Sequence, residues 1–338
     1  MRKYKPIPRG CTGGWEKPDG GPLIGRDTCI GYDMSIMKEG DTYRMWYSSA
    51  AGTISHATST DGVHWELPTC VLNRTLGSSW QESMVSRPRV IKKDGLYHMW
   101  YIGHIFDNDD EVGCGSVGYG TSKDGIVWEP LPEPVLVPEL SWEQRTIFCP
   151  FVQWEEESGL FKMWYSAGEQ RDADSIGYAT SRDGIHWEKY AGNPILSRVH
   201  ENYWEMMKVQ CADVHRHSDG YYYLFYIGID GDWHASINLA RSKDGITGWE
   251  RHPDNPIIAG TDGGWDYICV YRPAVLQTED GYWLYYNAAF YMDRDEREGR
   301  KVSEAIGRAV HKGFDLWPEE NAKPARNLPP FQGSLNRM

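Results

Sequence analysis

The 338-residue sequence has no long hydrophobic run, and no stretch of it approaches the roughly 18 apolar residues of a membrane-spanning helix. Its first residues, MRKYKPIPRG, lack the apolar segment of a secretory signal. Positive charge is also scarce, because 35 Lys and Arg face 48 Asp and Glu and the net charge is −13. Nucleic acids and anionic membranes are bound through positive charge. We therefore expect a cytoplasmic protein that binds neither of them.

The cysteines exclude two further classes. There are seven, an odd number, and none has the CxxC spacing of a zinc site. A disulfide framework is therefore excluded, and we expect reduced cysteines that fill the core. No other residues have the spacing of metal ligands, so we expect no metal and no cofactor. The sequence carries no signal for an oligomeric state.

The sequence is rich in a repeated motif. The Asp-Gly pairs of its first four copies begin at residues 61, 124, 183 and 244, so they are 63, 59 and 61 residues apart. A period of about 60 indicates propeller blades or solenoid coils. The copies are ISHATSTDGVHWE from Ile54, VGYGTSKDGIVWE from Val117, IGYATSRDGIHWE from Ile176, INLARSKDGITGWE from Ile237 and the more divergent IGRAVHKGFDLW from Ile306.

Each copy predicts two short strands joined at Asp-Gly, and a second hairpin precedes it, as in RVIKKDGLYHMWYIG from Arg89. Two hairpins make a four-stranded blade. We predict an all-β fold, a single five-bladed β-propeller with four-stranded antiparallel blades around a central channel. The predicted blades cover about residues 27–76, 77–138, 139–198, 199–259 and 260–320, and the segment before residue 27 could close the ring.

The innermost strands of the predicted blades can be aligned with one another. One aligned position holds Asp33, Arg87, Cys149, Cys211 and Arg272, and the position two residues further on holds Ser35, Arg89, Phe151, Asp213 and Ala274. By strand alternation both sets would point into the channel as two stacked rings. We interpret Arg89 and Asp213 as an ion pair that plugs the channel. Asp33, Arg87 and Arg272 fit either a second such plug or a ligand site.

Residues that recur in every blade are interpreted as scaffold. An acid recurs where each inner strand begins, at Asp27, Glu143, Glu205 and Asp266, with Gln81 as the exception. We expect these groups to bind backbone N–H groups, as we do for the aspartates of the Asp-Gly turns. Lys208 and Gln210 have the opposite parity to the channel residues, so they are functional or a bulge turns them inward.

The repeat A-T-S-x-D-G-x-x-W, the N-P-I at Asn193 and Asn255, and the position of Asp33 resemble the five-bladed propeller glycosidases. These are glycoside hydrolase families 43 and 32 and the phosphorylases of family 130. The resemblance implies that Asp33 is a catalytic base or nucleophile. The family 43 pattern has an Asp where this chain has Cys149 and a Glu where it has Gln210. The Asp-Pro element of families 32 and 130 is replaced by Arg87-Pro88.

Glycoside hydrolysis normally uses two carboxyl groups. We rank Glu205 and Glu82 first for the second one, with Glu169 and Asp230 at the ends of neighbouring strands on the same face. Loops on that face also carry His104 and Trp233, which suit a sugar.

Arg87 and Arg272 would bind a carboxylate or a phosphate bidentately. The sequence therefore favours a glycoside hydrolase that acts on a small oligosaccharide or glycoside, with an anionic sugar as one option. The alternatives are a phosphorylase that uses inorganic phosphate and a carbohydrate-binding propeller without activity.

Overall fold

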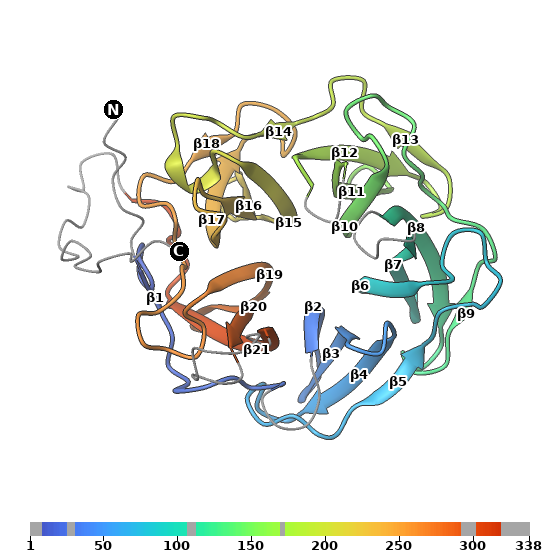
Figure 1. Cartoon of the computed structure of the whole chain (residues 1–338), viewed down its shortest axis with the longest axis horizontal. Coiled ribbons are helices and arrows are strands. Elements are labelled where there is room, and N and C mark those ends of the chain that lie inside the picture. The colour runs from blue at the N-terminus through green and yellow to red at the C-terminus, as the bar shows by residue number, and fades with distance from the viewer. Residues whose placement is uncertain (1–8, 26–30, 107–112, 170–172, 292–301, 319–338) are drawn as a thin grey trace, which may run out of the picture.

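The computed structural model describes residues 9–25, 31–106, 113–169, 173–291 and 302–318. Within these ranges the chain forms strands and one short 3-10 helix, Tyr203–Glu205. Figure 1 shows the strands gathered in sheets around a central axis, so the predicted all-β, propeller-like fold is confirmed. No helix in the described ranges is long and apolar enough to cross a membrane.

Most sheets are antiparallel meanders whose first strand lies at the centre of the ring (Figure 1). One contains β2 (Gly31–Glu39), β3 (Thr42–Ser49), β4 (Ile54–Ser59) and β5 (Thr69–Leu72). Another contains β15 (Lys208–Arg216), β16 (Tyr222–Ile229), β17 (Ala235–Ser242) and β18 (Glu250–Arg251).

A nine-stranded sheet consists of two such meanders, linked by one parallel pairing of Thr146 with Gly115. The first meander contains β6 (Met84–Lys93), β7 (Leu96–Phe106), β8 (Gly113–Ser122) and β9 (Glu129–Pro130). The second contains β10 (Thr146–Glu155), β11 (Leu160–Gly168), β12 (Ser175–Ser181), β13 (Trp187–Lys189) and β14 (Leu196–Ser197).

The remaining sheet combines both ends of the described chain. Its order is β1 (Trp15–Glu16), β21 (Val302–Lys312), β20 (Gly281–Tyr291) and β19 (Cys269–Gln277). Trp15 pairs with His311 and Glu16 with Val310, so the N-terminal segment supplies the outermost strand. The backbone N–H of Leu23 also donates to the Ile306 carbonyl at 2.7 Å.

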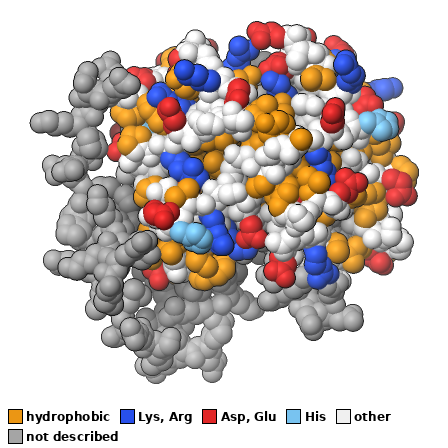
Figure 2. Space-filling view, turned by 90° about the horizontal axis from the view of Figure 1, so that it is seen from above, with side chains coloured by type: hydrophobic (Ala, Val, Ile, Leu, Met, Phe, Trp, Pro, Cys, Tyr) orange, Lys and Arg blue, Asp and Glu red, His pale blue; other side chains and the backbone are white. Residues whose placement is uncertain are grey.

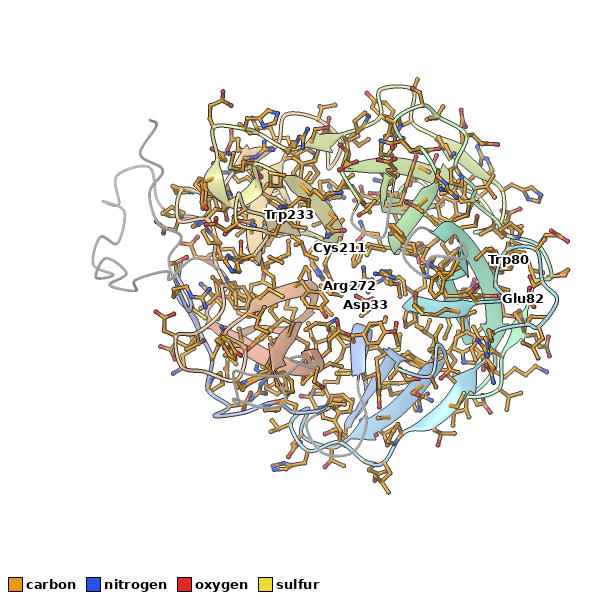
Figure 3. The ribbon with its side chains drawn as sticks, in the orientation of Figure 1. Asp33, Trp80, Glu82, Cys211, Trp233 and Arg272 are labelled. Atoms are coloured by element: carbon orange, nitrogen blue, oxygen red, sulfur yellow. The ribbon has the colours of Figure 1, made fainter. Side chains whose placement is uncertain are left out.

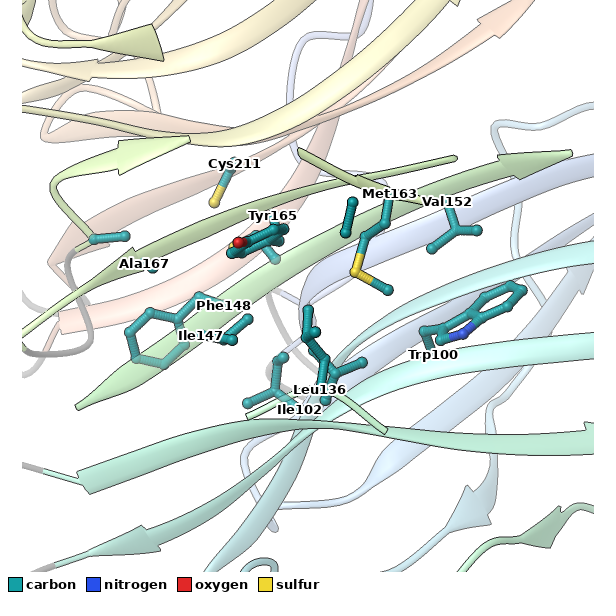
Figure 4. Close-up of a cluster of buried hydrophobic side chains, with 14 of the residues drawn as sticks. Trp100, Ile102, Leu136, Ile147, Phe148, Val152, Met163, Tyr165, Ala167 and Cys211 are labelled. Atoms are coloured by element: carbon teal, nitrogen blue, oxygen red, sulfur yellow. The ribbon is translucent and has the colours of Figure 1, made fainter. Parts of the chain in front are cut away.

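Buried side chains fill the spaces between adjacent sheets. One cluster includes Trp100, Phe148 and Met163 together with Cys149 and Cys211 (Figure 4). On the outer surface, acidic and basic side chains are interspersed with apolar ones (Figure 2). The aromatic residues of the repeats therefore form the core, as expected for residues that pack between sheets.

The Asp-Gly motif is a hydrogen-bonded turn. In the third copy the backbone N–H groups of Ile185 and His186 donate to Asp183 Oδ1 at 2.9 and 2.8 Å. The N–H of Gly184 donates to Ser181 Oγ at 2.9 Å. The same contacts recur at Asp61, Asp124 and Asp244. The turn aspartates therefore cap backbone groups, as the sequence predicted.

These turns also connect neighbouring groups of strands. An indole or phenol of one inner-to-outer group of strands donates to the carbonyl of a turn glycine in the next group, at 2.8 to 2.9 Å. The pairs are Trp46 with Gly125, Trp100 with Gly184, Trp164 with Gly245 and Tyr285 with Gly62. All four donors are fully buried, so each bond satisfies a group that burial would otherwise penalise.

The exposed turn carboxylate Asp124 should make stability depend on acidity. Hydrogen bonds from the backbone N–H groups of Val127 and Ile126 lower its pKa to about 2. The contribution of a carboxylate with a depressed pKa is present above its unfolded pKa of about 4 and is lost as the pH falls through about 2. Asp124→Asn should therefore lose less stability than the wild type between about pH 4 and pH 2. Urea unfolding across this range measures the difference, with the exposed Asp41→Asn as control, for which an unchanged pH dependence is expected.

Candidate functional site

Each inner strand carries a β-bulge at the same place. The register of the strand pair shifts between Tyr32 and Ser35 in β2, and at the equivalent positions of β6, β10, β15 and β19. One non-glycine residue at each bulge has a positive φ: Asp33 (52°), Arg87 (53°), Cys149 (48°), Cys211 (55°) and Arg272 (53°). We call these five residues the channel ring. A left-handed backbone is uncommon for such residues, and strained backbone of this kind clusters at functional sites.

The channel ring lies around the central axis of the sheets, where Figure 3 places Asp33, Cys211 and Arg272 close to one another. The residues two positions after the channel ring form the second ring of the sequence prediction. Two of them, Ser35 and Arg89, contact the neighbouring inner strands. Ser35 Oγ accepts from the Val90 N–H at 3.0 Å, and Arg89 Nε donates to the Val152 carbonyl at 2.9 Å. These contacts join adjacent inner strands, so the second ring stabilises the channel wall.

The predicted plug of Arg89 and Asp213 is wrong. The Arg89 guanidinium lies 3.9 Å from the centre of the Phe151 ring. Asp213 instead shares a hydrogen bond with His215 Nε2 and accepts from the Val275 N–H at 3.1 Å. A cation–π contact and a carbonyl satisfy the arginine without the carboxylate.

Asp33 and Arg87 are the ion pair of the channel ring. Arg87 Nε lies 3.3 Å from Asp33 Oδ2, and the Asp33 residue is only 3% exposed. The guanidinium lies over the ring of Phe148 at 5.0 Å. Burial opposes the charge on Arg87, but Asp33 and the two ring thiols raise its pKa above the ordinary value. Arg87 is therefore charged at any physiological pH.

Arg272 has no comparable partner. It is 4% exposed, and its buried Nε and Nη1 atoms meet no hydrogen-bond acceptor among the described residues. Burial opposes its charge, whereas Cys149, Cys211 and Asp33 raise its pKa. Unpaired buried donors on a charged group cost folding free energy unless a ligand satisfies them. Arg272 therefore carries two buried donors that no described residue satisfies.

The two thiols of the channel ring are adjacent and free. Both are buried, and both interact electrostatically with Arg272. The Cys211 N–H donates to Ser166 Oγ at 2.8 Å. The sequence predicts that these cysteines pack in the core, and both belong to a buried cluster. They also occupy the same bulge position as Asp33 and the two arginines.

His104 and Arg87 both contact the hydroxyl of Ser86. The His104 Nε2 is 2.8 Å from Ser86 Oγ, which also accepts from Arg87 Nη1 at 3.3 Å. Its ring is 5.8 Å from that of Phe148. His104 is 1% exposed. Because it holds the Ser86 hydroxyl that accepts from Arg87, it helps to position Arg87.

Glu304 is a carboxylate that the sequence analysis does not single out. The Tyr271 hydroxyl, next to Arg272 in β19, donates to Glu304 Oε1 in β21. Burial and the Glu304 carboxylate raise the pKa of Tyr271 well above its ordinary value, with a further contribution from Asp33. Tyr271 therefore interacts with both carboxylates. Glu304 stands just before the most divergent repeat, where sequence alignment of the blades is weakest.

Glu205 lies inside the scaffold. It is fully buried, accepts from the Tyr226 hydroxyl at 2.7 Å and forms an ion pair with Arg251 Nε at 2.5 Å. The equivalent acids Glu143 and Asp266 likewise accept from a tyrosine and pair with a lysine. Asp27 lies outside the described residues. These contacts match the structural interpretation of the repeated acids.

Glu82 is exposed and accepts from the Gly77 N–H at 3.2 Å, within its own loop. Glu169 is also exposed, at the end of β11. Neither has a described contact with the channel ring.

Lys208 and Gln210 contact the chain just before β12. Lys208 Nζ lies 3.1 Å from Asp174 Oδ1, and Gln210 Oε1 accepts from the Ala173 N–H at 3.1 Å. The bulge in β15 begins directly after Gln210. The two side chains therefore hold this segment beside the channel.

Asp230 and Trp233 belong to one turn between β16 and β17. Asp230 is 2% exposed and accepts from the N–H groups of Asp232 and His234 at 2.8 and 2.9 Å. Trp233 has a φ of 64° and is 59% exposed. The carboxylate shapes the turn, which leaves the indole on the surface and free to stack on a sugar.

A sequence model of Glycosyl hydrolases family 43 matches residues 29–303, which is most of the chain and contains the whole channel ring. The chain belongs to this family. Among curated relatives, an uncharacterized protein of Mycobacterium tuberculosis is 32% identical over 146 residues, which are 39% of this chain and 46% of that protein. The chain thus spans about half the length of that relative.

A second curated relative and a solved structure are also similar to this chain. A 1,2-beta-oligomannan phosphorylase of Thermoanaerobacter is 25% identical over 220 residues, covering 63% of this chain and 67% of the relative. The crystal structure of a thermostable family-43 glycoside hydrolase has a TM-score of 0.67 at 16% identity, covering 93% of this chain and all of that one. At this identity the structural likeness concerns the fold.

Proposed function

We propose that this chain cleaves the glycosidic bond of a small anionic glycoside or oligosaccharide, with Asp33 as the catalytic carboxylate. The observation that carries the proposal is the composition of the channel ring. It places one carboxylate near a half-buried guanidinium group, that of Arg87, and a buried one, that of Arg272, whose Nε and Nη1 have no hydrogen-bond acceptor among the described residues. A substrate carboxylate or phosphate would satisfy Arg272 while the glycosidic carbon lies near Asp33.

We also propose that the ring has five blades, one for each copy of the repeat. The bulges support this count, since each of the five inner strands carries one channel-ring residue. Five strands that converge with the same bulge bring residues far apart in sequence around one channel. The single domain and the blade boundaries follow from the same proposal.

Asp33 would act as base or nucleophile, and Glu304 is our candidate for the second carboxyl group. Glu205 and Glu82 are replaced in this role because the first is held by Tyr226 and Arg251 and the second lies in an exposed loop. Tyr271 connects the proposed pair, since it interacts with both Glu304 and Asp33. Proton transfer between such carboxyl groups and the substrate is the normal chemistry of glycoside cleavage.

Phosphorolysis is the second candidate reaction. Inorganic phosphate is itself a nucleophile, so its attack needs no base to activate water, and a single ring carboxylate would suffice as acid. Arg87 and Arg272 are suited to bind the phosphate. The similarity to a 1,2-beta-oligomannan phosphorylase supports testing this reaction.

The test is a substrate panel. Aryl uronides, their neutral counterparts and 1,2-linked mannosides are incubated with the full chain, with and without inorganic phosphate. Turnover of uronides without phosphate supports the first proposal, and sugar phosphate formed only with phosphate supports the second. Calorimetric binding of sugars without turnover across the panel would instead indicate a carbohydrate-binding propeller.

A further inference from the structure

Asn287 of β20 has a buried carboxamide without a hydrogen-bond partner. The residue is 0% exposed, and neither its Nδ2 nor its Oδ1 meets a partner among the described residues. It is the one carboxamide of the described chain whose donor and acceptor are both buried and unpaired. Burying an amide in this way costs folding free energy unless a hydrogen bond compensates. The side chain therefore indicates a partner from outside the chain.

Two serines at the equivalent position of other inner hairpins show which group this position meets. Ser48, Ser166 and Asn287 each lie opposite the residue that precedes the channel-ring residue of their own hairpin. Ser48 Oγ accepts from the N–H of Arg87 at 2.8 Å. Ser166 Oγ accepts from the N–H of Cys211, also at 2.8 Å. Each serine therefore binds the channel-ring residue of a neighbouring inner strand.

Asn287 faces the sheet of β2 to β5, which carries Asp33. Two residues before Asn287, the Tyr285 hydroxyl donates to the Gly62 carbonyl of that sheet at 2.9 Å, and alternate residues of a strand point to the same face. In the serine hairpins, the indole at this spacing donates to the same neighbour that the serine binds: Trp46 before Ser48 and Trp164 before Ser166. By the same pattern the channel-ring residue beside Asn287 is Asp33, and β20 is in contact with β2.

The scaffold does not explain an asparagine at this position. Its carboxamide does not make the hydrogen bond that the serines make, because both polar atoms are unpaired. The equivalent residues of β7 and β16 are the buried Ile102 and Ile227, so the fold also accepts an apolar side chain here. Serine or isoleucine would avoid the cost of a buried, unpaired amide. The asparagine thus places a free donor and a free acceptor beside the candidate catalytic carboxylate.

We propose that Asn287 is a specificity-determining residue that binds the sugar hydroxyl on the carbon next to the glycosidic carbon. This inference rests on the proposed function, in which the glycosidic carbon lies near Asp33. A carboxamide both donates and accepts, so it matches a hydroxyl, which does the same. Hydrogen bonds to this hydroxyl strengthen in the transition state of glycoside cleavage. The preferred substrate is then a glycoside with a free 2-hydroxyl, and 2-deoxy and 2-acetamido sugars are poor substrates.

Asn287→Ser tests the proposal on the substrate that the panel identifies and on its 2-deoxy counterpart. The variant carries the hydroxyl that the equivalent positions use, so its melting temperature should be equal to or higher than that of the wild type. Its kcat/KM should fall by about 30-fold on the parent substrate, because one hydrogen bond in the transition state is lost. On the 2-deoxy substrate it should match the wild type, which has no hydroxyl to bind there.

Asn238→Ser is the matched control. Asn238 of β17 is also 0% exposed and has an unpaired Oδ1, while its Nδ2 donates to the Ser236 carbonyl at 3.2 Å. The same substitution at this position should leave kcat/KM unchanged on both substrates.

Two results would overturn the inference: full activity of folded Asn287→Ser on the parent substrate, or equal losses on the parent and 2-deoxy substrates. Asn287→Ala takes its place if Asn287→Ser does not fold. Calorimetry with the parent and 2-deoxy sugars makes the same comparison without turnover. A wild type that binds sugars but cleaves none refutes the proposed function, and the affinities of Asn287→Ser for the two sugars then decide the inference. A wild type that neither binds nor cleaves refutes both.

Discussion

Asp33→Asn should reduce the rate of glycosidic cleavage by about 10³-fold, because proton transfer or nucleophilic attack by the carboxylate is lost. Asparagine is the right replacement for this position. Asp33 has a φ of 52°, and Asn adopts a left-handed backbone more readily than most residues. The substitution therefore removes the charge and keeps the bulge. Initial rates on the substrate identified by the panel measure the effect.

The control for this experiment is Asp41→Asn, which removes an exposed carboxylate from the turn after β2. It should retain full activity. Sugar binding by Asp33→Asn, measured by calorimetry, should persist although turnover is lost. Substantial activity in a folded Asp33→Asn protein would refute the catalytic role of this residue.

Arg272→Met should separate activity from stability. Loss of the guanidinium should lower kcat/KM for an anionic glycoside by about 100-fold and leave that for its neutral counterpart nearly unchanged, since only the anion needs the charge. The melting temperature should be equal or higher, because an apolar side chain replaces a buried cation with unpaired donors. Kinetics on matched charged and neutral substrates and thermal unfolding measure the two effects.

Arg216→Met is the matched control, since Arg216 is exposed and pairs with exposed Glu157. Its activity should equal that of the wild type on both substrates. Equal losses by Arg272→Met on charged and neutral substrates would contradict anion recognition. A marked fall in its melting temperature would show that Arg272 has a structural partner.

The sequence was sufficient to predict the strands and the ring positions. The Asp-Gly repeat marks turns whose hydrogen bonds are local, so composition and spacing predict them directly. The same repeat aligned the inner strands and singled out Asp33, Arg87 and Arg272. For these three residues the sequence predicts either an ion pair or a ligand site. Arg87 and Asp33 do form an ion pair.

The bulges could not be predicted in this way. Positive φ usually appears in a sequence as glycine or asparagine, whereas the channel ring holds Asp, Arg and Cys. Strand alternation alone therefore placed Arg89 and Asp213 opposite each other, although their contacts run along the channel wall. The relation of Tyr271 to Glu304 was missed because it joins two strands whose register is a tertiary property.

The pairing of β1 with β21 has a consequence for biosynthesis. A ribosome releases Trp15 and Glu16 long before their partners His311 and Val310 have been made. During translation the early segment has no neighbour, and the edge of β21 becomes available only when almost the whole chain has emerged. The ring is thus expected to close only after β21 has emerged, and nascent chains halted before residue 302 should remain open and sensitive to proteases.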